Sequence, residues 1–175
     1  MLLITFTILQ LMTATTLFDF NANTTIQSWR VVDDVVMGGR SSGSITLSEE
    51  GHGLFSGEVS LENNGGFSSV RHNLKAKDLA PYNKFIVRIK GDGKRYQFRV
   101  KSTDVQQHSY VANFETTGDW QEIEISFNSL KPTFRGRDLD MPNFPGEQVE
   151  EVAFLIGNKK PQSFKLEIDF IKASK

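Results

Sequence analysis

The stretch FIVRIKGDGKRYQFRV, residues 85–100, indicates the fold class because its hydrophobic and polar residues alternate. A period of two is the pattern of a β-strand that buries one face. The two alternating runs flank Gly91-Asp92-Gly93, and glycine tolerates the positive φ of tight turns. The stretch therefore predicts two strands joined as a hairpin.

The second of these runs also separates charge from apolar surface. Alternation in a strand places Arg95, Gln97 and Arg99 on one face and Tyr96 and Phe98 on the other. Basic residues interleaved with aromatic ones are one feature of nucleic-acid-binding surfaces, but here the two kinds are predicted to lie on opposite faces. We interpret the polar face as an ordinary solvated face of a sheet.

The same rhythm of short strands and turns continues along most of the chain. The predicted strands cover residues 44–48, 54–61, 67–74, 85–89, 96–100, 110–115, 120–127, 152–156 and 164–171. No window predicts an amphipathic helix of ten or more residues. The longest connection, residues 128–151, contains three prolines and is expected to be functional or packed down as an irregular loop. The pattern predicts an all-β sandwich or barrel.

Composition restricts the classes of function. The 175 residues carry 20 Lys and Arg against 21 Asp and Glu, so the net charge of −1 does not favour nucleic acid or anionic lipid as a partner. Because the chain has no cysteine, a disulfide, a thiolate metal site and a cysteine nucleophile are excluded.

The first sixteen residues, MLLITFTILQLMTATT, carry no charged side chain. An apolar run followed by small residues resembles a secretory signal, which predicts an exported protein, although the basic segment of such signals is missing. A first β-strand or a misplaced start codon are the alternatives, and without a signal the expected location is the cytoplasm. The apolar run is too short to span a bilayer. Residues 17–175 are expected to form a single domain.

The segment DDVVMGGRSSG, residues 33–43, contains a match to the G-x-S-x-G pattern of serine hydrolases. That pattern works where a strand turns sharply into a helix, whereas SITLS, which follows Gly43, reads as a strand. We therefore do not expect Ser41 to be a nucleophile, and we predict no enzymatic activity. No cofactor is expected, because the glycines form neither a P-loop nor a dinucleotide-binding motif.

Two kinds of ligand deserve comparison with purely structural roles. Asp33 and Asp34 offer oxygen ligands to Ca²⁺, but the alternating carboxylates of a calcium loop are missing, so we predict no metal site. Trp29, Tyr110 and Trp120 are aromatic residues of the type on which sugar rings stack, and core packing is the favoured alternative for Trp120.

Several segments together resemble one known family. WRVVDDVVMGGRSS at residues 29–42, NNGGFSSVR at 63–71, FNSLKPTFRGRDL at 127–139 and VAFLIGNKKPQSFKLEIDFIKA at 152–173 are similar, in the same order, to the complex I intermediate-associated protein 30 family. The resemblance implies a galactose-binding-like β-sandwich, or jelly roll. Its mitochondrial members are assembly factors that chaperone intermediates of respiratory complex I (NADH:ubiquinone oxidoreductase). No long basic transit peptide precedes the domain here, which predicts a compact bacterial homologue.

The resemblance also implies which residues matter. The family signature falls on Trp29, Asp34, Val36, Met37, Gly38, Gly39, Ser41, Gly65, Gly66, Phe67, Ser69, Arg71, Phe134, Arg135 and Gly136. Within it, Arg71 and Arg135 are expected to hold the long loops through charge-assisted hydrogen bonds to Asp33 or Asp34.

Three functions follow from these observations. The leading hypothesis is a non-catalytic domain that binds a protein partner, such as subunits of a membrane respiratory complex or unfolded protein. The alternative is an exported carbohydrate-binding module with a glycan ligand. An enzyme built around Ser41 or the Asp33–Asp34 pair is the third.

Overall fold

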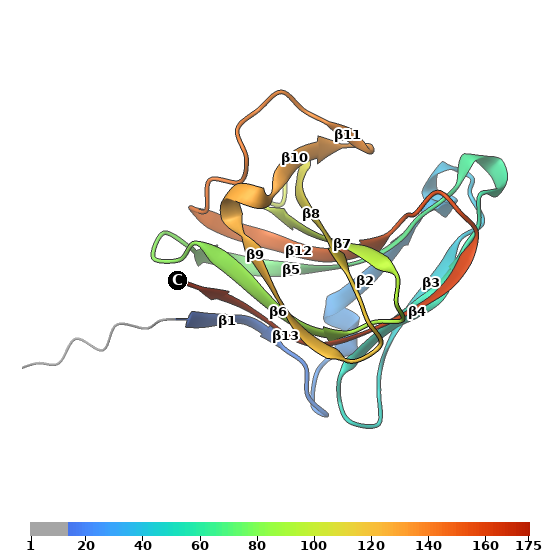
Figure 1. Ribbon diagram of the computed structural model, residues 1–175, viewed down its shortest axis with the longest axis horizontal. Helices are drawn as coiled ribbons and strands as arrows, with labels where there is room; N and C mark the ends of the chain where they lie inside the picture. The colour runs from blue at the N-terminus through green and yellow to red at the C-terminus, as the bar shows by residue number, and fades with distance from the viewer. Residues whose placement is uncertain (1–13) are drawn as a thin grey trace, which may run out of the picture.

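The computed structural model describes residues 14–175 as two antiparallel sheets packed face to face (Figure 1). Sheet A has six strands in the order β3-β4-β13-β6-β9, with β1 also paired to β13. Sheet B has seven strands in the order β11-β10-β8-β7-β12-β5-β2. The two sheets confirm the predicted all-β sandwich.

All nine predicted strands are present, together with four that the alternation did not reveal. The strands are β1 (Ala14–Asp19), β2 (Trp29–Asp33), β3 (Ser42–Leu47), β4 (Gly53–Val59), β5 (Ser68–Asp78), β6 (Lys84–Lys90), β7 (Arg95–Lys101), β8 (Ser109–Glu115), β9 (Trp120–Ser126), β10 (Lys131–Phe134), β11 (Arg137–Asp138), β12 (Gln148–Ile156) and β13 (Gln162–Ser174). The helical segments of the described residues are 3₁₀ turns: η1 (Ile26–Ser28), η2 (Asp34–Met37), η3 (Glu62–Asn64) and η4 (Phe127–Ser129).

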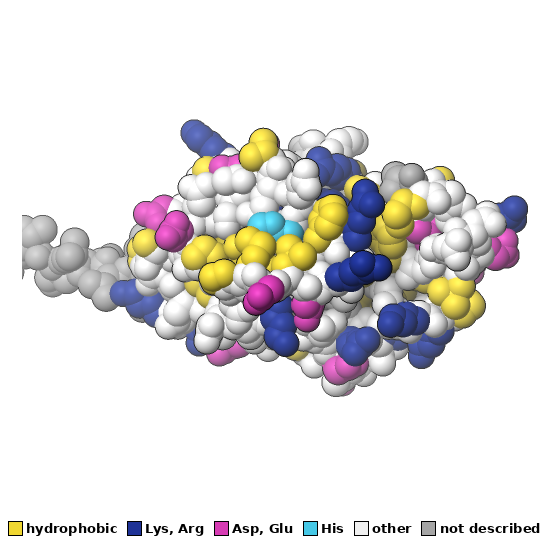
Figure 2. Space-filling model, turned by 90° about the horizontal axis from the view of Figure 1, so that it is seen from above, with side chains coloured by type: hydrophobic (Ala, Val, Ile, Leu, Met, Phe, Trp, Pro, Cys, Tyr) yellow, Lys and Arg dark blue, Asp and Glu magenta, His cyan; other side chains and the backbone are white. Residues whose placement is uncertain are grey.

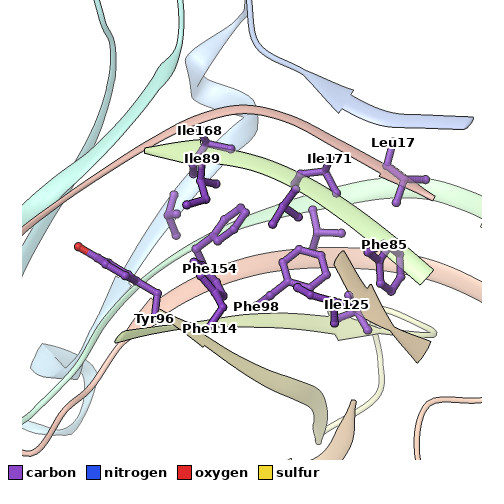
Figure 3. Close-up of a cluster of buried hydrophobic side chains, with 14 of the residues drawn as sticks. Leu17, Phe85, Ile89, Tyr96, Phe98, Phe114, Ile125, Phe154, Ile168 and Ile171 are labelled. Carbon is purple, nitrogen blue, oxygen red and sulfur yellow. The ribbon is translucent and has the colours of Figure 1, made fainter. Parts of the chain in front are cut away.

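Aromatic and branched aliphatic side chains from the inner faces of both sheets form the core (Figure 3). Phe85 of β6 and Phe98 of β7 meet across the layer with ring centroids 5.3 Å apart. Tyr96, Phe98 and Val100 are buried, while Arg95 is exposed and Gln97 and Arg99 are half-buried. The predicted division of this strand into two faces is therefore confirmed.

The predicted hairpin around Gly91-Asp92-Gly93 is wrong. β6 pairs with β13 and β9 in sheet A, whereas β7 pairs with β12 and β8 in sheet B. Residues 91–94 thus cross from one sheet to the other, and Asp92 anchors the crossing by accepting hydrogen bonds from Tyr96 Oη at 2.9 Å and Lys94 Nζ at 2.6 Å. A glycine-containing turn between two alternating runs does not specify which strands pair, because pairing partners are set by long-range packing.

The long connection at residues 128–151 is more regular than expected. It contains β10 and β11, which pair with each other and extend sheet B beyond β8. In Figure 1 this pair rises above the rest of the sandwich.

The predicted signal segment lies outside the described residues except for Ala14–Thr16, which begin β1 and pair with β13. Whether the segment directs export therefore stays a prediction. In the part of the chain that the structure describes, no helix is long and apolar enough to cross a membrane.

Candidate functional site

The Asp34 carboxylate lies at the centre of the loop DDVVMGGRSSG, residues 33–43. It is fully buried at the start of η2 and accepts hydrogen bonds from Ser41 N at 2.9 Å, Ser41 Oγ at 2.5 Å, Gly66 N at 2.5 Å and Phe67 N at 3.2 Å. Burial acts to raise the pKa of this carboxyl, but the hydrogen bonds outweigh burial and lower the pKa below its ordinary value. Asp34 therefore ties residues 39–41 to residues 65–67. We call Asp34, Ser41, Gly66 and Phe67 the Asp34 cluster.

Two signature glycines owe their identity to this carboxylate. A Cβ atom at Gly39 would overlap the Asp34 side chain, and one at Gly65 would lie 2.6 Å from Asp34 Oδ2. Gly38 has a different reason, because its φ of +90° ends η2 in a left-handed conformation that favours glycine. The turn from η2 into β3 therefore depends on Gly38 and Gly39.

The expected contacts from arginine to the two aspartates are wrong. Arg71 lies 3.8 Å from Glu151 (Nη1 to Oε1), and the Arg135 guanidinium stacks over the Phe134 ring at 5.3 Å. Asp33 instead accepts hydrogen bonds from Ser68 Oγ at 2.5 Å and Gly43 N at 2.9 Å. Serine hydroxyls and backbone amides serve as the partners of both aspartates.

The structure disfavours Ser41 as a nucleophile. Ser41 is 1% exposed, its Oγ donates to Asp34, and Ser42, the next residue, begins β3 rather than a helix. The oxygen that would attack a substrate is therefore buried and bound to a carboxylate, not to a histidine.

A cleft of about 630 Å³ lies on the outer face of sheet B, and we call it the basic cleft. Its lining residues are Val32, Met37, Gly66, Phe67, Arg71, Arg95, Gln97, Arg99, Lys101, Gln107, Ser109, Asn113, Thr133, Phe134, Arg135, Gly136, Leu155, Gly157 and Lys159. Six of these are Lys or Arg, and none is Asp or Glu. Figure 2, seen from the side where β10 and β11 lie in Figure 1, shows Lys and Arg side chains crossing the middle of the face between hydrophobic groups.

The basic cleft brings together signature residues from three distant parts of the chain. Met37 ends η2, Gly66 and Phe67 precede β5, and Arg71 lies within β5. Phe134 ends β10, and residues 135–136 form the turn from β10 to β11. The remaining signature residues lie elsewhere. Gly39, Ser41 and Gly65 lie around the Asp34 carboxylate, and Trp29 is buried in the core.

The register of three neighbouring strands shows which residues form the central part of the cleft. Across β5, β12 and β7, Arg71 lies opposite Ala153, and Ala153 lies opposite Arg99. The small alanine separates the two guanidinium-bearing residues. Sequence reasoning missed Arg99 as a site residue, because its alternation was interpreted as an ordinary solvated face.

Arg99 is held in a specific orientation. Its Nε and Nη2 atoms both donate to Gln97 Oε1, at 2.9 and 2.7 Å. Burial, together with the neighbouring charge of Arg71, lowers the pKa of Arg99 to about 10. The side chain remains a cation at neutral pH.

The aromatic residues proposed for sugar stacking do not line this cleft. Trp29 is 3% exposed and packs between Phe20 and His72, with ring centroids 5.2 and 5.0 Å away, and Tyr110 is 8% exposed. Trp120 is half-buried on sheet A, where Arg88 covers its ring at 4.6 Å. The buried rings of Trp29 and Tyr110 offer no free face to a sugar, whereas Trp120 lines a separate cleft on sheet A.

Three side chains beside sheet A could hold a metal ion. Glu50, His52 and Glu167 each offer one ligand atom, and these atoms lie within 4.8 Å of one another beside a second cleft of about 550 Å³. Lys165 Nζ lies 3.2 Å from Glu167 Oε1 and so competes for that carboxylate. None of the three belongs to the family signature.

Comparison with known proteins identifies relatives of this chain. The family model for complex I intermediate-associated protein 30 matches residues 18–168. The mitochondrial complex I intermediate-associated protein 30 of Drosophila melanogaster is 27% identical over 88% of this chain, and that of Mus musculus is 23% identical over 90%. The chain spans 60% and 55% of the lengths of these two proteins.

Solved structures with a similar fold include carbohydrate-binding modules. A family 11 module of the Clostridium thermocellum cellulase Lic26A-Cel5E has a TM-score of 0.67 and 20% identity, covering 92% of this chain and 94% of its own. The family 11 module in complex with a β-1,3-1,4-mixed-linked tetrasaccharide has a TM-score of 0.65 and 20% identity over 92% of this chain and 95% of its own. These similarities confirm the predicted galactose-binding-like jelly roll. With the family model covering most of the described domain, the chain belongs to the complex I intermediate-associated protein 30 family.

Proposed function

We propose that this chain is a non-catalytic domain that binds a protein partner in the manner of a respiratory complex I assembly factor, and that the basic cleft is its binding site. The proposal is supported by where the residues expected to form the family signature lie. Met37, Phe67, Arg71 and Arg135 come from separate segments and all line one cleft. If the members of a family share a binding site, the exposed residues that are characteristic of the family should lie together at that site.

The chemistry of the cleft supports binding over catalysis. Its lining contains no histidine and no carboxylate that could act as a general base. Arginine side chains, by contrast, are common at protein interfaces because the planar guanidinium makes several directed hydrogen bonds.

Affinity purification from the native host tests the proposal when wild type is compared with the double variant Arg71→Gln/Arg135→Gln. We expect quantitative mass spectrometry to find subunits of a membrane respiratory complex enriched with wild type and lost with the double variant. Arg40→Gln is the matched control, because Arg40 is largely exposed and pairs with Glu62 outside the cleft. Equal recovery of the same subunits by all three proteins would count against the cleft as the site.

Carbohydrate binding is the second candidate, supported by the fold shared with family 11 modules. Gln97, Ser109 and Asn113 line the cleft and have side chains that can hydrogen-bond sugar hydroxyls. A glycan array tests this reading. Binding of a glucan that is weakened by Asn113→Ala would support it, and a blank array would remove it.

A further inference from the structure

The basic cleft concentrates positive charge in a chain whose net charge is −1. The nearest neutralising group is Glu151 of β12, whose side chain is 4% exposed. Its Oε2 accepts from Arg30 Nη2 at 2.7 Å, and its Oε1 lies 3.8 Å from Arg71 Nη1. One buried carboxylate already shared by two arginines leaves the rest of the cleft cationic.

The Arg99 guanidinium group has hydrogen-bond donors that no described residue uses. Within the described residues it forms no ion pair, and its only hydrogen-bond acceptor is Gln97 Oε1. Nη1 therefore has no partner there, on a side chain that is already partly desolvated. A bound anion would relieve the repulsion between Arg99 and Arg71, and a carboxylate fits a guanidinium with two parallel hydrogen bonds.

Apolar side chains flank these cations. Met37 is 63% exposed on one rim, and Phe134 is 36% exposed on another, although both are large hydrophobic residues. Exposed apolar groups beside a cleft mark a binding surface, and methionine adapts to partners of varied shape. The ligand should thus offer both negative charge and hydrophobic side chains.

We propose that the basic cleft binds an acidic peptide segment in which carboxylate side chains alternate with apolar ones. This proposal rests on the proposed function and names the kind of segment that the protein partner presents. A peptide fits better than an acidic glycan, because the apolar rim formed by Met37, Phe67 and Phe134 has no matching group on a sugar acid. The lining also has no Trp or Tyr on which a sugar ring would stack.

Fluorescence anisotropy with the full chain tests this directly. The probe is a short fluorescein-labelled peptide that alternates glutamate with leucine, and its control has glutamine in place of every glutamate. We expect the glutamate peptide alone to bind, and Arg99→Gln to weaken binding about tenfold or more, as expected for loss of a charge-assisted hydrogen bond. Arg99→Lys should recover part of the affinity, and Arg40→Gln should leave it within about twofold, as for an exposed ion pair outside the cleft.

Circular dichroism establishes that each variant is folded, and Lys101→Gln provides a second cleft variant if Arg99→Gln is not. Equal binding of the glutamate and glutamine peptides would overturn the proposal. So would binding of a uronic acid oligosaccharide, but not the peptide, in an Arg99-dependent way. If the peptide fails while the respiratory subunits of the affinity purification still depend on Arg71 and Arg135, the proposed function stands and only the acidic-segment proposal falls.

Discussion

Replacing Asp34 by asparagine tests whether one buried carboxylate holds residues 39–41 and residues 65–67 together. The side chain keeps its shape, but one of the two acceptor oxygens becomes an NH₂ group that cannot accept. In the better orientation the amide oxygen faces Gly66, Phe67 and the Ser41 hydroxyl, and the NH₂ group opposes Ser41 N–H.

The expected cost follows from these contacts. A buried N–H that loses its acceptor costs about 1–3 kcal/mol, and the remaining bonds lose the strength that the charge gave them. The total is about 3–4 kcal/mol in the free energy of unfolding, or a fall in Tm of about 6–16 °C for a chain of this length. Asp33→Asn is the matched control, because Asp33 is only half-buried and accepts two hydrogen bonds, so its expected cost is about 1–2 kcal/mol.

Urea unfolding at pH 7, followed by tryptophan fluorescence, measures both variants, and the m-values show whether unfolding stays two-state. The lowered pKa of Asp34 also predicts that stability depends on pH. Since hydrogen bonding lowers the pKa of Asp34 in the folded protein, its contribution is complete above the unfolded pKa of about 3.9 and is lost as pH falls through the folded value. A cost below about 1 kcal/mol for Asp34→Asn, or a larger cost for Asp33→Asn, would refute the reasoning.

Gly39→Ala should destabilise the fold more than Gly38→Ala, because a Cβ at position 39 overlaps Asp34 whereas position 38 has open space and costs only about 1–2 kcal/mol for its positive φ. Ser41→Ala should lower the free energy of unfolding by about 1–3 kcal/mol in the same assay, and a fluorophosphonate probe should label neither protein. Burial lowers the pKa of His72, so the stability that its neutral form contributes is complete above about pH 6.5 and falls as pH drops from there through the folded pKa. His72→Gln should therefore flatten the decline in stability between about pH 7.5 and pH 5.

Each of these predictions has a result that contradicts it. Equal melting temperatures for the two glycine variants would remove the steric reason for Gly39. Covalent labelling that disappears in Ser41→Ala would restore the hydrolase hypothesis. An unchanged pH slope in His72→Gln would mean that another group titrates in this range.

The sequence was sufficient to predict nine of the thirteen strands in the described residues but not their partners. Alternation at Tyr96, Phe98 and Val100 is a local property, so the burial of that face could be predicted from β7 alone. Its pairing with β12 rather than with β6 joins residues about fifty positions apart in the chain and depends on how the whole sandwich packs. For that reason the predicted hairpin between β6 and β7 is not formed.

The candidate site could be predicted only in part, because its residues also come together through long-range packing. The glycines at 38, 39, 65 and 66 were expected to belong to the family signature, but the carboxylate that lies between them could not be located without the fold. Arg99 faced outward as expected, yet only the register across Ala153 shows that it lies near Arg71 and lines a cleft. A solvated strand face and a binding face have the same alternation.

Site-specific photocrosslinking in the native host is the measurement that tests the binding role of the basic cleft most directly. A photoreactive amino acid at position 113, which is exposed on β8 and lines the cleft, should crosslink to a discrete protein partner. The same group at position 122, exposed on β9 of sheet A, should not. Peptide mapping is expected to place the crosslink in an acidic segment of the partner. Crosslinks of equal yield from both positions, or none from position 113 while position 122 captures a partner, would contradict the assignment of the cleft as the binding site.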